Sequence, residues 1–358
     1  MGWPKLRPVV FLLAAVAAYA GVDGKVINGT TGKPQAGATV TLFQTSSAGP
    51  QDLGSVKSDA EGKFVFTQDV KPGQGGGPLL LQAVYGGVQY NKIVTPGMPT
   101  GNVDIPVYEP SKVQGGAKLD QHMILLEPAA AGEMRVSETY LYKNEGKTTW
   151  NDPARGTLQF SLPDAAQGKV EINVLAPGGM PIRRAADPGP KANTFKLDFP
   201  IKPGESRVDM VWTMPFKTPG MFESHVLAKG GSIRMVVPVG VTLKGPDMEA
   251  LGQEPTTKAT IYNVKGPDLM IAVEGTGTLQ DSSAGSQDDG GAPGGPGLSE
   301  NLPKLYALAA GNSGLLQTVM AVKWILLTIT IMLALGFVLL YRKGDPLAKA
   351  SGNVRGRG

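Results

Sequence analysis

The sequence predicts an all-β protein with two tandem antiparallel β-sandwich domains, followed by one C-terminal transmembrane helix. Three observations support this fold class. Short apolar runs that alternate with polar residues are separated by turn residues, and the 49 glycines and 29 prolines make up 78 of the 358 residues. No long run with the 3.6-residue period of an amphipathic helix interrupts these segments. Near the C-terminus, residues 324–341 are 18 consecutive uncharged residues.

Residues 1–20 have the pattern of a secretory signal peptide. Lys5 and Arg7 precede an apolar stretch at residues 9–18, and the Ala-Tyr-Ala sequence at residues 18–20 has the small-x-small form of a signal-peptidase site. We expect cleavage after Ala20. An uncleaved membrane anchor is the alternative, although about ten apolar residues are too few to span a bilayer comfortably.

Residues 21–112 are predicted to form the first sandwich, in which two motifs follow each other in order. The first motif comprises GKVING at residues 24–29 and KPQAGATV at residues 33–40, and the second is SDAEGKF at residues 58–64. Here the chain resembles the carboxypeptidase regulatory-like family over about residues 21–110. The resemblance implies a small prealbumin-like sandwich with a carbohydrate-binding-like fold, and it implies none of the zinc peptidase machinery.

The residues of the second motif have expected structural roles. Asp59 can accept backbone N–H groups across the turn, and Gly62 can adopt positive φ there. Phe64 and Phe66 share one face of their strand and are therefore predicted core residues, with sugar stacking as the alternative.

Three aromatic residues are the candidate ligand-binding residues. Tyr85 and Tyr90 flank the Gly86-Gly87 turn and are candidates for an exposed aromatic platform. Trp150 follows a loop in the second domain and is a further candidate for an exposed ring. The alternative for each is a structural aromatic side chain whose polar atom is hydrogen-bonded.

Residues 118–280 are predicted to form the second sandwich, and they carry no family resemblance. Glu138, Tyr140 and Tyr142 lie two residues apart and so share one strand face, as half-buried structural residues or as a ligand site. Trp212 alternates with apolar neighbours and is a predicted core residue. Across both domains, alternating runs predict strands at residues 39–42, 63–66, 79–85, 136–142, 157–162, 170–174, 195–201, 208–214, 222–227, 233–243 and 269–273.

The remaining segments predict how the domains are tethered. Residues 281–303 are rich in Gly, Pro and Ser and are expected to be a flexible linker. Residues 304–323 form a juxtamembrane segment, and residues 324–341 are the predicted transmembrane helix. At about 1.5 Å per residue this helix reaches roughly 27 Å, close to the thickness of a bilayer core. A buried core helix is the alternative.

The charge distribution predicts the orientation in the membrane. The tail at residues 342–358 holds five basic residues and one acid, Asp345, so we expect it to be cytoplasmic and the domains to be exported. Residues 21–323 hold 27 basic and 29 acidic residues, a net charge of −2. The basic pI of 9.0 thus belongs to the targeting segments, and nucleic-acid binding is not expected.

The sequence contains few residues suited to catalysis. It has no cysteine, which excludes disulfides, thiolate catalysis and Cys-ligated zinc and favours a bacterial envelope over a eukaryotic cell surface. Its two histidines, His122 and His225, lie in no metal-binding motif, and no nucleophile-elbow, phosphate-loop or dinucleotide motif is present. We therefore expect no catalytic residue, no metal and no cofactor.

Together these features predict a non-catalytic single-pass membrane protein. It would display β-sandwich modules on the exported side of a bacterial envelope, periplasmic or extracellular, and bind a glycan or another envelope protein. Two alternatives stay open: a structural or assembly accessory subunit of a membrane complex, and an unrecognised envelope hydrolase.

Overall fold

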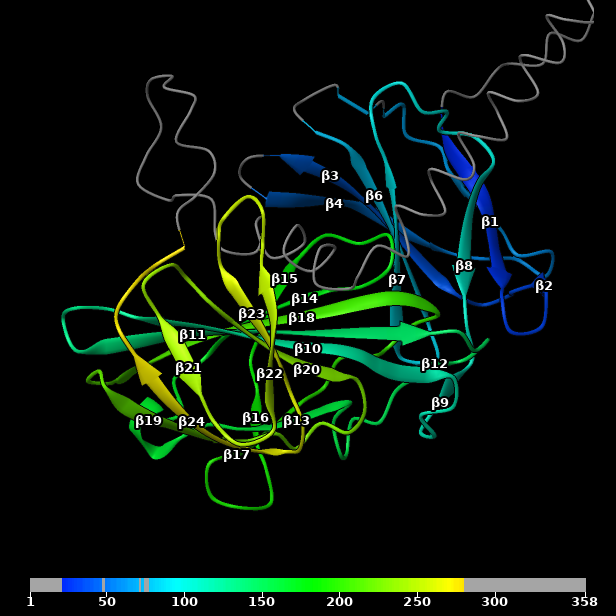
Figure 1. Cartoon of the computed structure of the whole chain (residues 1–358). Coiled ribbons are helices and arrows are strands. Elements are labelled where there is room, and N and C mark those ends of the chain that lie inside the picture. The colour runs from blue at the N-terminus through cyan, green and yellow to red at the C-terminus, as the bar shows by residue number, and fades with distance from the viewer. Residues whose placement is uncertain (1–20, 47–48, 71, 74–76, 280–358) are drawn as a thin grey trace, which may run out of the picture. The chain divides into compact units, whose positions relative to one another are not determined.

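The computed structural model describes residues 21–46, 49–70, 72–73 and 77–279, which form strands and loops (Figure 1). Within these ranges no α-helix is present, and η1, a 3₁₀ turn at Asp164–Ala166, is the one helical element. The predicted all-β fold class is confirmed for this part of the chain. No helix in it is long and apolar enough to cross a bilayer. The predicted signal peptide, linker, juxtamembrane segment, transmembrane helix and tail lie outside the described residues.

Two four-stranded sheets form the first sandwich. In one sheet β1 is central, with β8 on one side and, on the other, β5 along its first half and β2 at its end; the strands are β1 (Val22–Asn28), β2 (Lys33–Pro34), β5 (Lys63–Phe66) and β8 (Val103–Val107). The order of the other sheet is β4–β3–β6–β7, with strands β3 (Thr39–Ser46), β4 (Gly49–Lys57), β6 (Leu79–Tyr85) and β7 (Val88–Val94).

Alternating side chains of these two sheets build the first core. It contains Val26 of β1, Leu42 of β3, Leu81 of β6 and the two phenylalanines of β5. Phe64 and Phe66 are 2% and 3% exposed, and their ring centroids lie 6.2 Å apart. The prediction that they are core residues is confirmed.

The turn before β5 has the geometry that its sequence predicts. The Oδ1 atom of Asp59 accepts hydrogen bonds from the backbone N–H groups of Glu61 at 3.0 Å and Lys63 at 2.7 Å. Gly62 has a φ of 74°, and a Cβ atom on it would lie 2.6 Å from the backbone oxygen of Val26. Only glycine satisfies both conditions, because other residues rarely adopt this φ and their Cβ would clash.

An eight-stranded sheet dominates the second sandwich. Its order is β15–β14–β18–β11–β10–β20–β23–β22, with strands β10 (Ala117–Pro128), β11 (Glu133–Asn144), β14 (Glu171–Leu175), β15 (Ile182–Arg184), β18 (Gly204–Pro215), β20 (Ser232–Val237), β22 (Met248–Gln253) and β23 (Thr260–Val264).

Two three-stranded sheets share a core with this large sheet. The first has the order β13–β17–β16 and the second β19–β24–β21, with strands β13 (Leu158–Ser161), β16 (Asp187–Pro188), β17 (Thr194–Leu197), β19 (Gly220–His225), β21 (Thr242–Lys244) and β24 (Asp268–Glu274). The second core joins residues of all three sheets, among them Val136, Phe160 and Phe222. Trp212 is 2% exposed within it, as predicted.

Three strand pairs are parallel, so the prediction of purely antiparallel sandwiches is wrong in these places. β1 pairs with β8, and β10 pairs with β20. The third pair is β12 (Thr149–Trp150) with β9 (Pro110–Ser111). The physical reason is that alternation within one strand reports which face is buried and carries no information about the direction of the partner strand.

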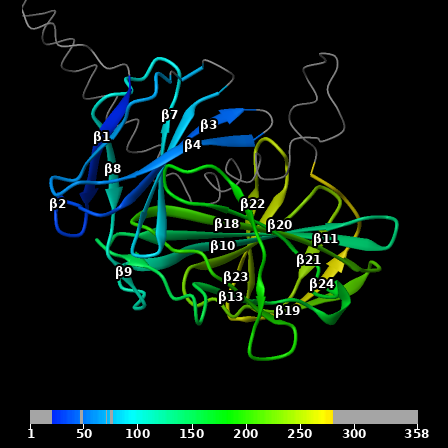
Figure 2. The same cartoon turned by 180° about the vertical axis from the view of Figure 1, so that it is seen from behind.

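The two sandwiches are joined where β9 pairs with β12 (Figures 1 and 2). The backbone N–H of Thr149 donates to the carbonyl oxygen of Glu109 at 3.0 Å, and the Thr149 hydroxyl lies 2.9 Å from the hydroxyl of Tyr90. The Thr30 hydroxyl also donates to the carbonyl oxygen of Lys147. All described residues belong to one of the two compact units into which the chain divides.

Candidate functional site

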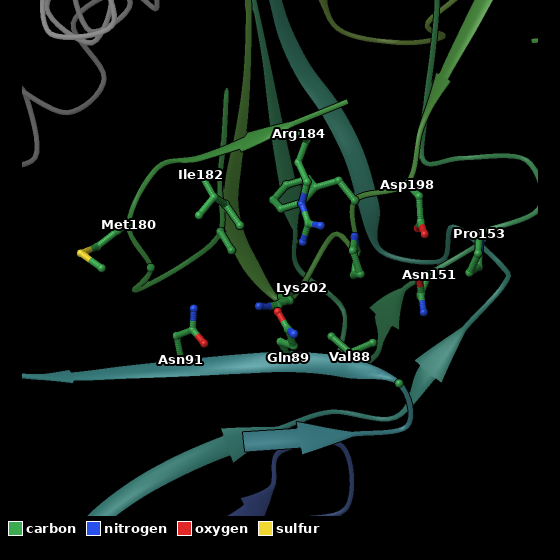
Figure 3. A pocket seen from close by; sticks show the side chains of 15 residues that line it. Val88, Gln89, Asn91, Asn151, Pro153, Met180, Ile182, Arg184, Asp198 and Lys202 are labelled. Atoms are coloured by element: carbon green, nitrogen blue, oxygen red, sulfur yellow. The ribbon is translucent and has the colours of Figure 1, made fainter. Parts of the chain in front are cut away.

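A cleft at the junction of the two sandwiches is the candidate site (Figure 3). Its cavity volume is about 290 Å³. The β6–β7 hairpin of the first sandwich forms one wall. The second sandwich supplies the rest from three segments: the residues after β12, the β14–β15 hairpin and the residues after β17. Residues far apart in the sequence thus line a single cavity.

Lys202 is the most unusual group in this cleft. It directly follows Ile201, whose backbone bridges to Trp150, and its side chain is half-buried. Its Nζ atom lies over the ring of Tyr90, 5.1 Å from the centroid. Burial, with a smaller contribution from the positive charge of Arg184, lowers the pKa of Lys202 to about 8. Among the described residues no carboxylate lies within ion-pair distance of it.

Arg184 brings a second positive charge to the cleft. It ends β15, the edge strand of the large sheet, and Figure 3 shows its guanidinium pointing into the space that Lys202 also faces. Successive residues of a strand point to opposite sides. Arg183 accordingly does not line the cleft and instead donates to Glu171 at 3.0 Å. Arg184 has no such ion pair in the described part of the chain.

Three amide side chains line the cleft together with these cations. Gln89 and Asn91 lie two residues apart on β7 and therefore share its outward face. Asn151 comes from the second sandwich, and its Oδ1 atom is buried with no hydrogen-bond partner within the described ranges. Each amide offers both a donor and an acceptor, so the cleft can hydrogen-bond a polar ligand from two walls.

One acid and several apolar side chains complete the lining. Asp198 is exposed and makes no ion pair with Lys202 or Arg184. Met180 and Ile182 are 45% and 46% exposed at the rim contributed by the β14–β15 hairpin. The cleft therefore combines a net positive charge with an apolar rim.

Tyr85 and Tyr90 do not form the predicted exposed platform. Tyr90 is 4% exposed, and its hydroxyl donates to the carbonyl oxygen of Tyr108 at 2.8 Å. Tyr85 packs against the first core, and its hydroxyl donates to Glu109 at 2.5 Å. This hydrogen bond is the main cause that raises the pKa of Tyr85 to about 12. The prediction of exposure is wrong because both rings extend the buried faces of β6 and β7.

Trp150 is half-buried against the second core, with its ring centroid 6.3 Å from that of Tyr142. It borders a shallower depression that includes Lys112, Arg155 and Lys229. The structure does not bring Trp150 together with Tyr85 or Tyr90 in one cavity. Tyr90 contributes to the candidate cleft only through its ring beneath Lys202.

Glu138, Tyr140 and Tyr142 share one face, as predicted, and that face lies inside the second core. Glu138 accepts a hydrogen bond from Tyr140 at 2.7 Å and one from Trp212 at 3.0 Å. The Nε2 atom of His122 lies 2.8 Å from Glu138. All of these side chains are at most 6% exposed, so this cluster is a buried network and no part of a surface site.

The cleft residues Lys202 and Arg184 were not among the residues predicted from the sequence. Each is one of 34 basic residues, and they lie 18 positions apart. The one usable signal is the Arg183-Arg184 pair in a short run after the Gly178-Gly179 turn. Alternation in such a run separates the two guanidinium groups onto opposite sides, although it does not reveal what either one faces.

Two features of the described residues bear on the hydrolase alternative. Among them no group of three or more His, Cys, Asp or Glu side chains could hold a metal ion. An exposed pair joins His225 Nδ1 to Asp268 at 2.6 Å, and Ser161 lies in the same shallow depression. The Ser161 hydroxyl donates to the backbone oxygen of His225, which leaves no serine–imidazole hydrogen bond of the kind a nucleophile requires.

Comparisons with known proteins assign no family to the chain. No family model and no curated protein matches it. Among solved structures, the M1 zinc metallopeptidase from Deinococcus radiodurans is similar over 44% of this chain and 42% of that chain, with 11% identity and a TM-score of 0.23. A two-domain M1 zinc metallopeptidase mutant bound to L-arginine gives 12% identity, 44% and 42% coverage and a TM-score of 0.23. The chain spans under half the length of these enzymes, and TM-scores this low support no conclusion about its fold or activity.

Proposed function

We propose that the protein is a non-catalytic, membrane-tethered binding protein of a bacterial envelope. Its two sandwiches are displayed on the exported side, and the cleft at their junction binds a glycan or protein partner. The observation that carries this proposal is the cleft itself. Two positive charges of the second sandwich, which form no ion pair with the described residues, and amide groups from both sandwiches converge there. The cavity of about 290 Å³ is close to the lower end of the range for small-molecule sites, roughly 300–1,000 Å³.

The sequence supports the tethering part of the proposal. Residues 1–20 direct export, residues 324–341 span the bilayer, and the basic tail at 342–358 stays in the cytoplasm. The linker at residues 281–303 separates the sandwiches from the membrane. The protein would therefore meet ligands in the periplasm or at the cell surface.

We infer in addition that residues 21–112 form a carboxypeptidase regulatory-like sandwich. The hydrogen bonds of Asp59 and the positive φ of Gly62 support this inference, because they give the second motif the turn that its sequence implies. The module contributes the β6–β7 hairpin to the cleft. We propose that the role of this module is recognition.

The experiment that tests the proposed function uses the full-length protein in its native membranes. Alkaline carbonate extraction and protease treatment of spheroplasts or intact cells report on tethering and sidedness, and affinity isolation in mild detergent reports on the retained partner. The proposal predicts a carbonate-resistant protein whose sandwiches are digested from outside and which retains a glycan or an envelope protein. Extraction by carbonate, or protection of the sandwiches from external protease, would contradict it.

A further inference from the structure

We propose that the cleft binds a sugar acid, free or as a unit of an acidic glycan, with its carboxylate held between Lys202 and Arg184. This inference rests on the proposed function, because it names the ligand class of the same site. Both side chains line one cavity, come from different segments of the second sandwich and face the hairpin of the first. Neither cation is paired with a carboxylate among the described residues.

The position of Lys202 in the cleft has a cost in free energy. A half-buried ammonium group next to a guanidinium group is less stable than an ammonium group in water, which is why its pKa is lowered to about 8. The ring of Tyr90 at 5.1 Å compensates only in part, since a cation–π contact carries no opposite charge. A bound carboxylate would supply that charge and remove the repulsion between the two cations.

The two neighbouring arginines point to opposite sides of β15. Arg183 is neutralised by Glu171 on the outer side of β15, whereas Arg184 faces the cleft and forms no ion pair with any of the described residues. A guanidinium group can bind a carboxylate through two parallel hydrogen bonds, which a lysine cannot do. Arg184 would therefore orient the ligand, and Lys202 would add a second positive charge from the side of the Tyr90 ring.

Amide side chains on both walls of the cleft are available to the hydroxyl groups of the ligand. Gln89 and Asn91 project from one wall and Asn151 from the other, and each amide can donate to one hydroxyl and accept from its neighbour. Adjacent hydroxyls on a ring that also bears a carboxylate are the defining groups of a uronic acid.

The cavity volume favours a saccharide over an acidic peptide. At about 290 Å³ the cleft has room for one or two small rings. Asp198, the acid in the lining, gives an internal test because its charge should repel a carboxylate. Removing that charge should strengthen binding of a sugar acid and leave binding of a neutral sugar unchanged.

The test measures ligand binding to purified full-length protein in detergent micelles by calorimetry or ligand-observed NMR. The probes are glucuronate, galacturonate and a trigalacturonate, with glucose, inorganic phosphate and an acidic peptide as comparison arms. The proposal predicts that the uronates bind at least ten times more tightly than glucose. It also predicts that K202M and R184Q each weaken uronate binding at least tenfold, that D198N strengthens it, and that R183Q leaves it unchanged.

Several outcomes would overturn the proposal. These are equal binding of glucose and uronates, phosphate or peptide binding tighter than uronate binding, and uronate binding that survives both K202M and R184Q. Far-UV circular dichroism and thermal melting establish that each variant is folded, and R183Q controls for the loss of a neighbouring positive charge. If the protein retains an envelope partner that K202M does not release, the binding function stands and the sugar-acid assignment fails. If no partner is retained at all, the proposed function itself fails.

Discussion

His122 and Glu138 meet inside the second core, where Nε2 of His122 lies 2.8 Å from Oε2 of Glu138 and the imidazole stacks on Tyr140 with ring centroids 4.0 Å apart. Together with Trp212 these residues come from the adjacent strands β10, β11 and β18. A polar network, in addition to apolar packing, thus connects these three neighbouring strands at the centre of the large sheet. Removing one member would leave the others buried without a partner.

We predict that E138A destabilises the protein by about 3–5 kcal/mol, because it strands the buried donors of Tyr140, Trp212 and His122. The matched control is E171A, which breaks the exposed pair with Arg183 and should change stability by about 0–1 kcal/mol. Urea denaturation of both variants measures the difference. Equal effects would show that the buried network contributes no more than a surface pair.

The same network predicts a loss of stability in acid. Burial by itself would raise the pKa of Glu138, but the hydrogen bonds and charge of His122 and the hydrogen bonds from Tyr140 and Trp212 lower it below its ordinary value of 4.5. The unfolded chain then binds more protons than the folded one between these two pKa values. Stability from Glu138 is therefore present above about pH 4.5 and lost as the pH falls through the folded pKa. Thermal melting from pH 6 to pH 3 should show this loss in wild type and a smaller one in E138A.

Lys202 gives the same sign of pH dependence, in the alkaline range, although its charged form destabilises the fold where that of Glu138 stabilises it. Its pKa is about 8 in the folded protein and 10.5 in the unfolded chain, so the unfolded chain binds more protons between these values and stability rises with pH across that window. K202M should therefore stabilise the protein below pH 8, by about 1–3 kcal/mol, and the gain should vanish near pH 10.5. Melting temperatures of wild type and K202M between pH 6 and pH 10.5 measure it. A gain in stability that does not depend on pH would contradict the lowered pKa of Lys202 in the folded protein.

The turn before β5 predicts a difference between two glycine substitutions. Gly32 and Gly62 both have a φ of 74°, but a Cβ on Gly32 meets nothing within 4 Å whereas one on Gly62 would lie 2.6 Å from the oxygen of Val26. G32A should cost about 1–2 kcal/mol for backbone strain, and G62A should cost about 1–3 kcal/mol more for the clash. Chemical denaturation of the two variants tests this. Equal losses of stability would mean that the backbone near Gly62 shifts to accommodate the new Cβ atom at no cost in free energy.

The strands that the sequence predicted are those whose own residues alternate between apolar and polar types, including residues 136–142, which the structure buries on both faces. Residues 63–66 and 79–85 were predicted from alternation, and the structure places β5 and β6 at these residues. β10 was not predicted, because residues 121–128 are all buried and alternation disappears when both faces of a strand are covered. The parallel pairing of β1 with β8 joins residues about 80 positions apart and leaves no local trace.

The candidate site was harder to predict than the fold. The aromatic residues proposed from the sequence stood out as rare side chains, yet Tyr90 proved to be buried and Tyr85 hydrogen-bonded to Glu109. The cleft instead depends on where the chain brings Gln89, Arg184 and Lys202 together. Such convergence depends on tertiary structure, which the spacing of single Lys, Arg and Gln residues does not reveal.

The central claim is that the cleft between the sandwiches is where the protein meets its partner, and photocrosslinking in native membranes tests it most directly. A benzophenone amino acid replaces Met180 at the rim of the cleft or, as the control, Met221 on β19; these side chains are 45% and 49% exposed, and only Met180 lines the cleft. We predict adducts with a glycan or protein partner from position 180 and none from position 221, and we expect K202M to reduce the yield. Adducts from position 221 alone, or from neither position, would contradict the account.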